Sequence, residues 1–285
     1  MSEAAFSRGV PDEKGFNQDP PSQIIGSVNE LYNQQEYQNA LVKATDYLVD
    51  YPCSALLQRV KGLAHMGLKE IDMALECFRE TLKLNPEFPD AYIDLGNALT
   101  LQGKSEEALV SYSQALRVKP GFAHAHNNIG LILTLRNDTS GAIESFRLAI
   151  ASDPELIQPY ENVCDLLKGK VFKEQSPKLL ALVTALLKKN TAAKVKDWAP
   201  AAISLIKLRP SMKSFLEREA QNSNALPLKE KISALTEDPA LVLLMSRCPI
   251  QDIELENMLR RLRLQLLSAA SKADFPPVFL AFTTA

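Results

Sequence analysis

A single spacing of 34 residues recurs along the chain between residues 21 and 156 and limits what it can fold into. A fixed period between about 20 and 50 residues is typical of solenoids, in which each repeat packs only on its neighbours. Such proteins usually present a groove to another molecule instead of carrying out chemistry. The positions that share the spacing are Ala40, Ala74, Ala108 and Ala142; Pro52, Pro86, Pro120 and Pro154; Gly62, Gly96 and Gly130; and Phe78, Tyr112 and Phe146.

Residues 89–122 show most clearly how one repeat is expected to fold. An apolar stripe at i, i+3, i+4 and i+7 predicts a first helix with one buried face. A second helical pattern follows, and Pro120 ends it because proline cannot continue a helix. Small Gly96 and Ala108 would let the two helices approach closely, with Tyr112 filling the gap beyond them. The stripe of the first helix consists of Tyr92, Leu95, Gly96 and Leu99.

These residues resemble the tetratricopeptide repeat (TPR) family, whose pattern has Gly or Ala at the eighth position, Ala at the twentieth and Pro at the thirty-second. The first unit has Val28 where Gly is usual, as expected of a terminal repeat that caps the stack. The resemblance implies an all-α solenoid of helical hairpins in a right-handed superhelix, followed by a C-terminal helical region. The predicted organisation is a disordered leader over 1–20, four TPR units over 21–54, 55–88, 89–122 and 123–156, a degenerate fifth unit with capping helices over 157–190, and an all-helical region over 191–285.

Beyond residue 156 the period fades, but helical patterns continue. Ser176 followed by Pro177 predicts the start of a helix. Residues 275–285 are apolar, and two explanations remain open: they dock on the preceding helices, or the rest of their core lies beyond Ala285 in a longer protein. Residues 238–267 loosely resemble the linker helices of bacterial TPR proteins that continue into a methyltransferase or sulfotransferase, a resemblance that adds no catalytic residue. Further helices are predicted at about 178–189, 195–208, 211–221, 228–236, 239–246 and 252–268.

The composition argues against nucleic acid and membrane partners. The 32 Lys and Arg residues nearly balance the 34 Asp and Glu residues, so no concentrated basic face is expected. No segment reaches the roughly 18 consecutive apolar residues of a membrane span, and the polar N-terminus lacks the apolar core of a signal peptide. The cysteines lie far apart, which predicts reduced thiols and a cytoplasmic protein. They are Cys53, Cys77, Cys164 and Cys248.

A search for catalytic motifs finds no phosphate-binding loop, dinucleotide fingerprint, zinc-protease motif or nucleophile elbow. His124 and His126 lie two positions apart on a predicted helix, about 200° around its axis, so they cannot bind one metal ion together. We therefore expect no catalytic residue, no metal site and no cofactor, and we predict that the chain is not an enzyme.

The predicted binding surface is the inner face of the first helix of each unit. In the TPR family the second, fifth, sixth, ninth and thirteenth positions line a concave groove, and the resemblance implies the same here. Asp94, Asn128 and Asn162 occupy successive sixth positions and partly resemble the asparagine ladder in the TPR arm of O-GlcNAc transferases. Amide groups both donate and accept hydrogen bonds, so they suit an extended peptide backbone. The candidate groove residues are Arg59, Leu63, Asp94, Asn97, Asn127, Asn128, Leu131 and Asn162.

Three functions remain open at this point. The leading hypothesis is a non-catalytic scaffold that binds a protein or peptide segment, with the asparagines forming hydrogen bonds and the two leucines giving apolar contact. The alternative is the substrate-recruiting part of a TPR-containing methyltransferase, sulfotransferase or glycosyltransferase whose catalytic domain lies beyond Ala285. The third is a self-associating scaffold that uses Phe279 and Phe282; the oligomeric state is not predicted. Some TPR proteins bind the C-terminal carboxylate of a partner through basic groove residues, a mode called a carboxylate clamp. We reject this mode here because acidic groove residues such as Asp90 would repel a carboxylate.

Overall fold

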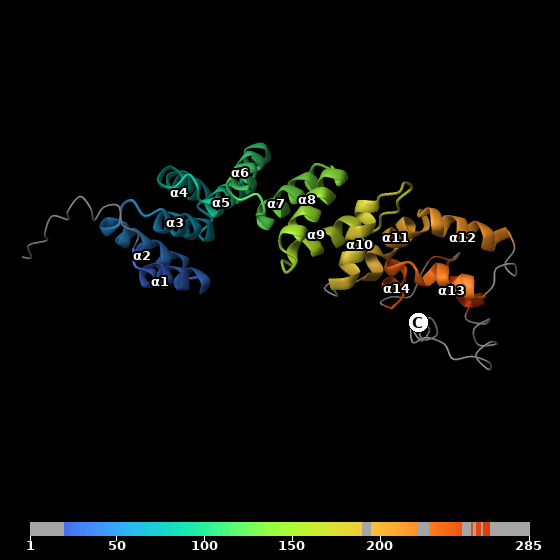
Figure 1. Ribbon diagram of the computed structural model, residues 1–285. Coiled ribbons are helices and arrows are strands. Elements are labelled where there is room, and N and C mark those ends of the chain that lie inside the picture. The colour runs from blue at the N-terminus through green and yellow to red at the C-terminus, as the bar shows by residue number, and fades with distance from the viewer. Residues whose placement is uncertain are drawn as a thin grey trace, which may run out of the picture. The chain divides into compact units, whose positions relative to one another are not determined.

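The computed structural model describes residues 20–189, 195–221, 228–246, 252, 255–257 and 259–262. Within these ranges the chain forms helices α1 to α14 and no β-strand (Figure 1), so the prediction of an all-α fold is confirmed. The chain divides into two compact units, residues 1–136 and 137–285, which are described separately below. The predicted leader, apart from Pro20, and the apolar residues 275–285 lie outside the described residues.

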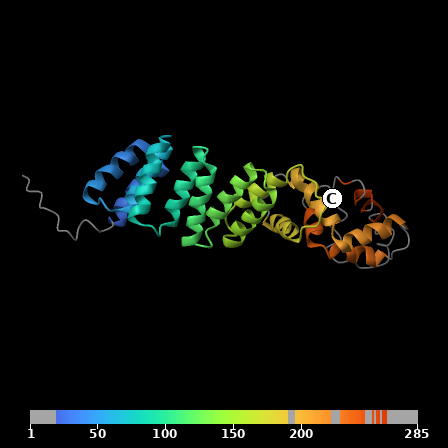
Figure 2. The same ribbon diagram turned by 90° about the horizontal axis from the view of Figure 1, so that it is seen from above.

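The first unit is a series of helical hairpins in which each helix packs on the helices before and after it in the sequence. Figure 2 shows these helices side by side, from blue to green. A proline at the first turn of α5 fits a helix start, because its missing N–H is not needed there. The helices are α1 (Ser22–Asn33), α2 (Tyr37–Asp50), α3 (Ala55–Gly67), α4 (Ile71–Leu84), α5 (Pro89–Leu101), α6 (Ser105–Val118) and α7 (Ala123–Leu135).

Close glycine–aromatic contacts hold the hairpins together. A Cβ atom added to Gly96 would lie 2.8 Å from Cδ1 of Tyr112, and one added to Gly62 would lie 2.9 Å from Cδ1 of Phe78. Real Cβ atoms do not come so near, so only glycine allows this packing. The rings of Phe78 and Tyr112 are almost completely buried in one apolar cluster with Leu99. The predicted close approach at Gly96 is therefore confirmed.

The turn inside each hairpin also repeats, although its sequence does not. Gln35, Lys69, Gly103 and Asn137 all have a positive φ, between 61° and 77°, and lie 34 residues apart. This left-handed conformation is easy for glycine and strained for most other residues. Asparagine also adopts it more readily than most residues, so the hairpin geometry imposes the conformation at two positions, Gln35 and Lys69, where the residue type does not favour it.

The second unit continues with helices whose contacts reach further along the chain. α14 packs on α10 and α11, and α11 also contacts α9. The N-cap expected at Ser176 is present, because its Oγ accepts a hydrogen bond from the Leu179 N–H at 3.3 Å. The helices are α8 (Thr139–Ser152), α9 (Gln158–Leu167), α10 (Pro177–Lys189), α11 (Val195–Lys207), α12 (Pro210–Gln221), α13 (Leu228–Thr236) and α14 (Pro239–Met245).

The core of the second unit is built from large side chains and paired charges instead of glycine–aromatic contacts. Trp198 of α11 is 1% exposed, and leucines of α10 and α14 are buried with it. Buried charges are paired here: Glu219 of α12 with Lys231 of α13 at 2.9 Å, and Asp238, just before α14, with Arg209 at 2.7 Å. No repeat of this pattern along the sequence predicts these contacts.

Candidate functional site

Polar side chains of α3, α5, α6 and α7 contact one another in the first unit, on the surface that the sequence predicts to be the inner face. We call this group the inner-face network, and it consists of Arg59, Asp94, Asn97, Tyr112 and Asn128. Each of these side chains takes part in at least one hydrogen bond or ion pair with another member. Four of the five were candidate groove residues in the sequence; Tyr112, which anchors the asparagines, was assigned only to the core.

The inner-face network has two separate parts, and the first is an ion pair. Nε of Arg59 on α3 donates to Oδ2 of Asp94 on α5 at 2.5 Å. The guanidinium group also lies 5.5 Å from the centre of the Phe88 ring, within the range of a cation–π contact. The Asp94 side chain is 10% exposed and that of Arg59 26% exposed. The pair therefore fixes a partly exposed guanidinium group on the inner face.

Burial has a clear electrostatic effect on this pair. Loss of solvent raises the pKa of the Asp94 carboxyl above its usual 3.8, because the charged form is poorly hydrated there. The charge of Arg59 and its hydrogen bond act in the opposite direction without overcoming the burial. Asp94 is therefore a buried anchor for Arg59 and not a freely solvated anionic contact.

The second part consists of the asparagines and Tyr112. Oδ1 of Asn97 accepts hydrogen bonds from the Tyr112 hydroxyl and from Nδ2 of Asn128, both at 2.8 Å. Nδ2 of Asn127 in turn donates to Oδ1 of Asn128 at 3.4 Å. These bonds set the orientation of the Asn97 amide, since its oxygen is fully used. Within the described part of the chain, the Asn97 amide nitrogen makes no hydrogen bond.

Exposed leucines lie on the same helices as the asparagines. Leu131 is 41% exposed, and Leu101 and Leu135 are 64% and 75% exposed. Leu101 and Leu135 are the last residues of α5 and α7, and each occupies the thirteenth position of its 34-residue repeat. In the TPR family that position lines the groove, and the recurrence of leucine there is a sequence signal that could have added both residues to the candidates.

The remaining candidate residues lie in different settings. Leu63 is partly buried and packs against the apolar cluster of the first unit. Asn127 is 6% exposed, so it positions Asn128 more than it faces solvent. Asn162 lies on α9 in the second unit and is not placed relative to the others. The structure therefore brings together Arg59, Asp94, Asn97, Asn127 and Asn128 in one unit, with Leu131 on the same helix as the last two.

The described residues offer little that would support chemistry. They contain no group of three or more His, Cys, Asp or Glu side chains placed to hold a metal ion. Burial lowers the pKa of His126, whose Nε2 lies 3.2 Å from the Pro120 carbonyl oxygen, and it raises the pKa of the Cys164 thiol to about 11. A thiol with so high a pKa is a poor nucleophile. None of the described helices combines the length and the apolar character needed to cross a membrane.

Solved structures similar to this chain show the same fold. PilF of Pseudomonas aeruginosa matches with a TM-score of 0.53 and 16% identity over 76% of this chain and 96% of PilF. PilW, described as a widely conserved type IV pilus biogenesis factor, matches with a TM-score of 0.52 and 16% identity over 79% of this chain and 100% of PilW. At such low identity the likeness shows the helical-repeat fold alone.

Sequence comparisons identify the repeats themselves. The small glutamine-rich tetratricopeptide repeat-containing protein 2 of Saccharomyces cerevisiae is 31% identical over 100 residues, which are 35% of this chain and 29% of that protein. The chain thus spans less than a third of the length of this curated relative. The comparisons add no support to the resemblance of residues 238–267 to transferase linkers. Family models for the tetratricopeptide repeat match residues 60–88, 77–110, 96–135 and 123–156. The chain therefore contains tetratricopeptide repeats, and the predicted resemblance is confirmed over residues 60–156.

Proposed function

We propose that the inner face of the first unit binds an extended protein segment and that the chain is a non-catalytic scaffold. The observation that carries this proposal is the Asn97 amide. Its oxygen accepts two hydrogen bonds from Tyr112 and Asn128, and its nitrogen has no partner within the described residues. An oriented N–H donor beside further amides suits a peptide carbonyl group.

The neighbouring side chains support the same partner class. The guanidinium of Arg59 is held through Nε by Asp94, which leaves its terminal N–H groups to meet a second acceptor. Exposed Leu101 and Leu131 on the same helices offer apolar contact to side chains of the bound segment. A peptide backbone supplies carbonyl acceptors, and its side chains supply the apolar surface. Binding of this kind is usually about micromolar, near −8 kcal/mol.

We also propose a cytoplasmic location, and a protein partner instead of nucleic acid or a membrane. The choice of a protein partner is supported by the near balance of 32 basic and 34 acidic residues in the chain. The inner-face network is also not basic, because Asp94 balances the charge of Arg59. A phosphate backbone or an anionic lipid surface would need a concentrated positive charge.

The test removes the Asn97 donor and keeps its acceptor. Peptides are selected from a randomised library against the full chain, and their affinity is measured by calorimetry. In Asn97→Asp, a carboxylate oxygen still accepts from Tyr112 and Asn128, but the N–H donor is gone. We expect affinity to fall about tenfold, because one hydrogen bond is lost and a carbonyl group now faces a like-charged oxygen.

A matched pair of variants tests the apolar part of the face. Leu101→Asp places a charge at a 64% exposed leucine on the inner helix α5, and Val110→Asp places one at a 60% exposed valine on the outer helix α6. Affinity should fall in the first variant and stay unchanged in the second. Unchanged affinity in both Asn97→Asp and Leu101→Asp would remove this face from the function.

A further inference from the structure

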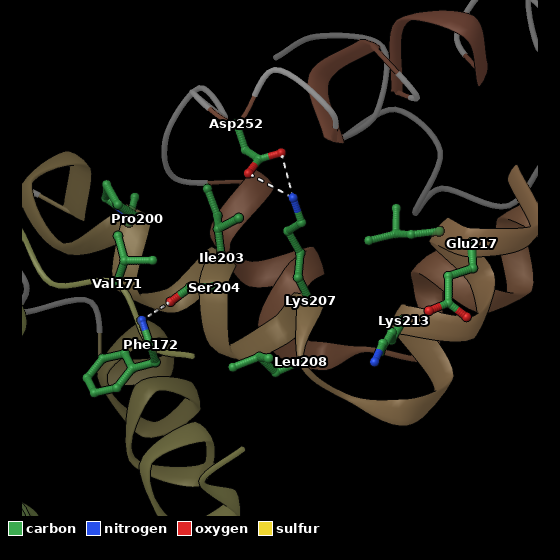
Figure 3. A pocket seen from close by; sticks show the side chains of 12 residues that line it. Val171, Phe172, Pro200, Ile203, Ser204, Lys207, Leu208, Lys213, Glu217 and Asp252 are labelled. Atoms are coloured by element: carbon green, nitrogen blue, oxygen red, sulfur yellow. Dashed lines mark hydrogen bonds and ion pairs between the residues drawn. The ribbon is translucent and has the colours of Figure 1, made fainter. Parts of the chain in front are cut away.

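The second unit contains an apolar pocket of about 660 Å³ that the proposed function does not use. Its walls come from α11, from α12 and from the segment between α9 and α10 (Figure 3). This volume lies within the range of binding pockets for small molecules and side-chain clusters. Apolar lining residues include Val171, Phe172, Ile203, Leu208 and Leu216.

Most polar groups at the pocket already have partners inside the protein. Oγ of Ser204 accepts a hydrogen bond from the Phe172 N–H at 2.9 Å. Nζ of Lys207 pairs with both carboxylate oxygens of Asp252, at 3.1 and 3.3 Å (Figure 3). An occupant that needs many hydrogen bonds would have to break these contacts. The pocket therefore favours an apolar occupant.

The edge of the pocket is open to solvent and carries both apolar and charged side chains. Val171 lines the pocket and is 68% exposed, although it adjoins the partly buried Phe172. Lys213 and Glu217 line the α12 side and are exposed (Figure 3). An exposed apolar side chain beside a mainly apolar hollow is typical of a surface that another segment covers.

We propose that residues 275–282 of the same chain occupy this pocket. This stretch reads FPPVFLAF, and its only polar groups are those of the backbone. Three phenylalanines, a valine and a leucine in eight residues match a pocket with a mainly apolar lining in which Ser204, Lys207 and Asp252 are already paired. The proposal is independent of the peptide-binding face of the first unit.

The last described residues before this segment lie near the pocket, so the segment can reach it. Leu262, the last described residue, lies beside Phe215 and Glu219 of α12. Leu216 and Glu217 of the same helix line the pocket. Residues 263–274 then separate Leu262 from the apolar stretch, and this many residues can span up to about 40 Å when extended. A tether of this length gives an effective concentration of about a millimolar, so even a weak contact would be populated.

Limited proteolysis of the full chain tests the proposal. Chymotrypsin cleaves after exposed aromatic residues, so docking should protect the bonds after Phe279 and Phe282. Val171→Asp puts a charge at the exposed rim, where the fold tolerates it. We expect these bonds to be cleaved about tenfold faster in this variant, as measured by mass spectrometry, because a charge at the rim opposes burial of an aromatic ring.

A matched control separates docking from a general effect of charge. Val49→Asp changes a 73% exposed valine on α2 in the first unit, and cleavage at Phe279 and Phe282 should equal that of the parent. The proposal is overturned if the parent is cleaved as fast as a synthetic peptide of residues 271–285. It is also overturned if the parent is protected but Val171→Asp remains equally protected.

A second measurement identifies the occupant. A fluorescent peptide of residues 271–285 should bind the full-length Phe279→Asp variant, whose own segment is impaired, and not the Val171→Asp/Phe279→Asp double variant. Failure to bind the single variant would overturn the proposal. Protection in the parent should be independent of protein concentration; protection that rises with concentration would show that a second copy supplies the segment.

Discussion

In the first unit each helix packs on its neighbours in sequence, whereas in the second unit α14 returns to pack on α10 and α11. The hairpins of the first unit close on small residues that meet aromatic rings, as Gly96 meets Tyr112. The second unit joins its helices through buried charges, as Glu219 meets Lys231. Local, repeated contacts therefore tolerate partial change, whereas contacts that occur once, such as the return of α14 to α10, make distant segments depend on each other.

Removing one partner of the buried ion pair in the second unit should lower the free energy of unfolding more than any other change considered below. In Lys231→Met, Glu219 loses its partner while its side chain remains about 5% exposed. An unpaired buried charge lowers the free energy of unfolding by about 3–5 kcal/mol. The measurement is urea unfolding followed by the fluorescence of Trp198, the single tryptophan, which is buried in the second unit.

A surface pair between the same two helices provides the control. Arg218 and Glu230 lie 3.6 Å apart, with side chains 60% and 58% exposed. Arg218→Met should change the unfolding free energy by only about 0–1 kcal/mol, since solvent screens exposed pairs. Equal losses in Lys231→Met and Arg218→Met would contradict the role given to burial.

The next effect concerns the glycine contacts of the first unit. Gly96→Leu would force α5 away from the Tyr112 ring, and overpacking of this kind destabilises by about 1–3 kcal/mol. Thermal unfolding followed by circular dichroism measures the loss. Because the contacts are local, the transition seen by Trp198 should move less than the circular dichroism transition.

An open glycine on α1 serves as the matched control. A Cβ atom at Gly26 would meet nothing within 4 Å, and the residue lies inside a helix. Gly26→Leu should therefore raise stability by about 0.5–1 kcal/mol, because glycine is a poor helix former. If Gly96→Leu melts like the parent, the close approach of α5 and α6 does not limit packing.

The smallest effect is a pH dependence of the first unit that comes from Asp94. Burial raises the pKa of this carboxyl in the folded chain, so the folded state binds its proton more tightly than the unfolded state does. Stability from this group is therefore greatest at low pH and is lost as pH rises from about the usual 3.8 through the raised folded pKa.

Asp94→Asn tests this sign because it removes the titrating group but keeps an oxygen that can accept from Arg59. The midpoint of urea unfolding, measured across the acid range, should fall less with rising pH in the variant than in the parent. Asp46→Asn, at an exposed position on α2, controls for the loss of one charge. A steeper fall in Asp94→Asn than in the parent would show that the pKa shift has the opposite direction.

Much of the candidate site could be predicted from repeat positions, but its interactions could not. The sixth and ninth positions of the repeats predicted Asp94, Asn97 and Asn128 as candidate groove residues, and the structure places them on α5 and α7. That Asn97 accepts hydrogen bonds from both Tyr112 and Asn128 depends on distances between three helices. The position of a residue in its repeat predicts on which face of the helix it lies. Its hydrogen-bond partner depends on the distance between neighbouring helices, which the repeat position does not give.

The helical hairpins and their length follow from the amino-acid order alone, because glycine, alanine and aromatic residues recur at the positions where neighbouring helices meet. The tertiary structure was needed to reveal the left-handed turns at Gln35 and Lys69, because these residue types do not favour a positive φ. It also decided that α14 packs on α10 and α11 and that Glu219 pairs with Lys231. Contacts that occur once, between distant segments, leave no period in a sequence, so they emerge only when the chain is folded.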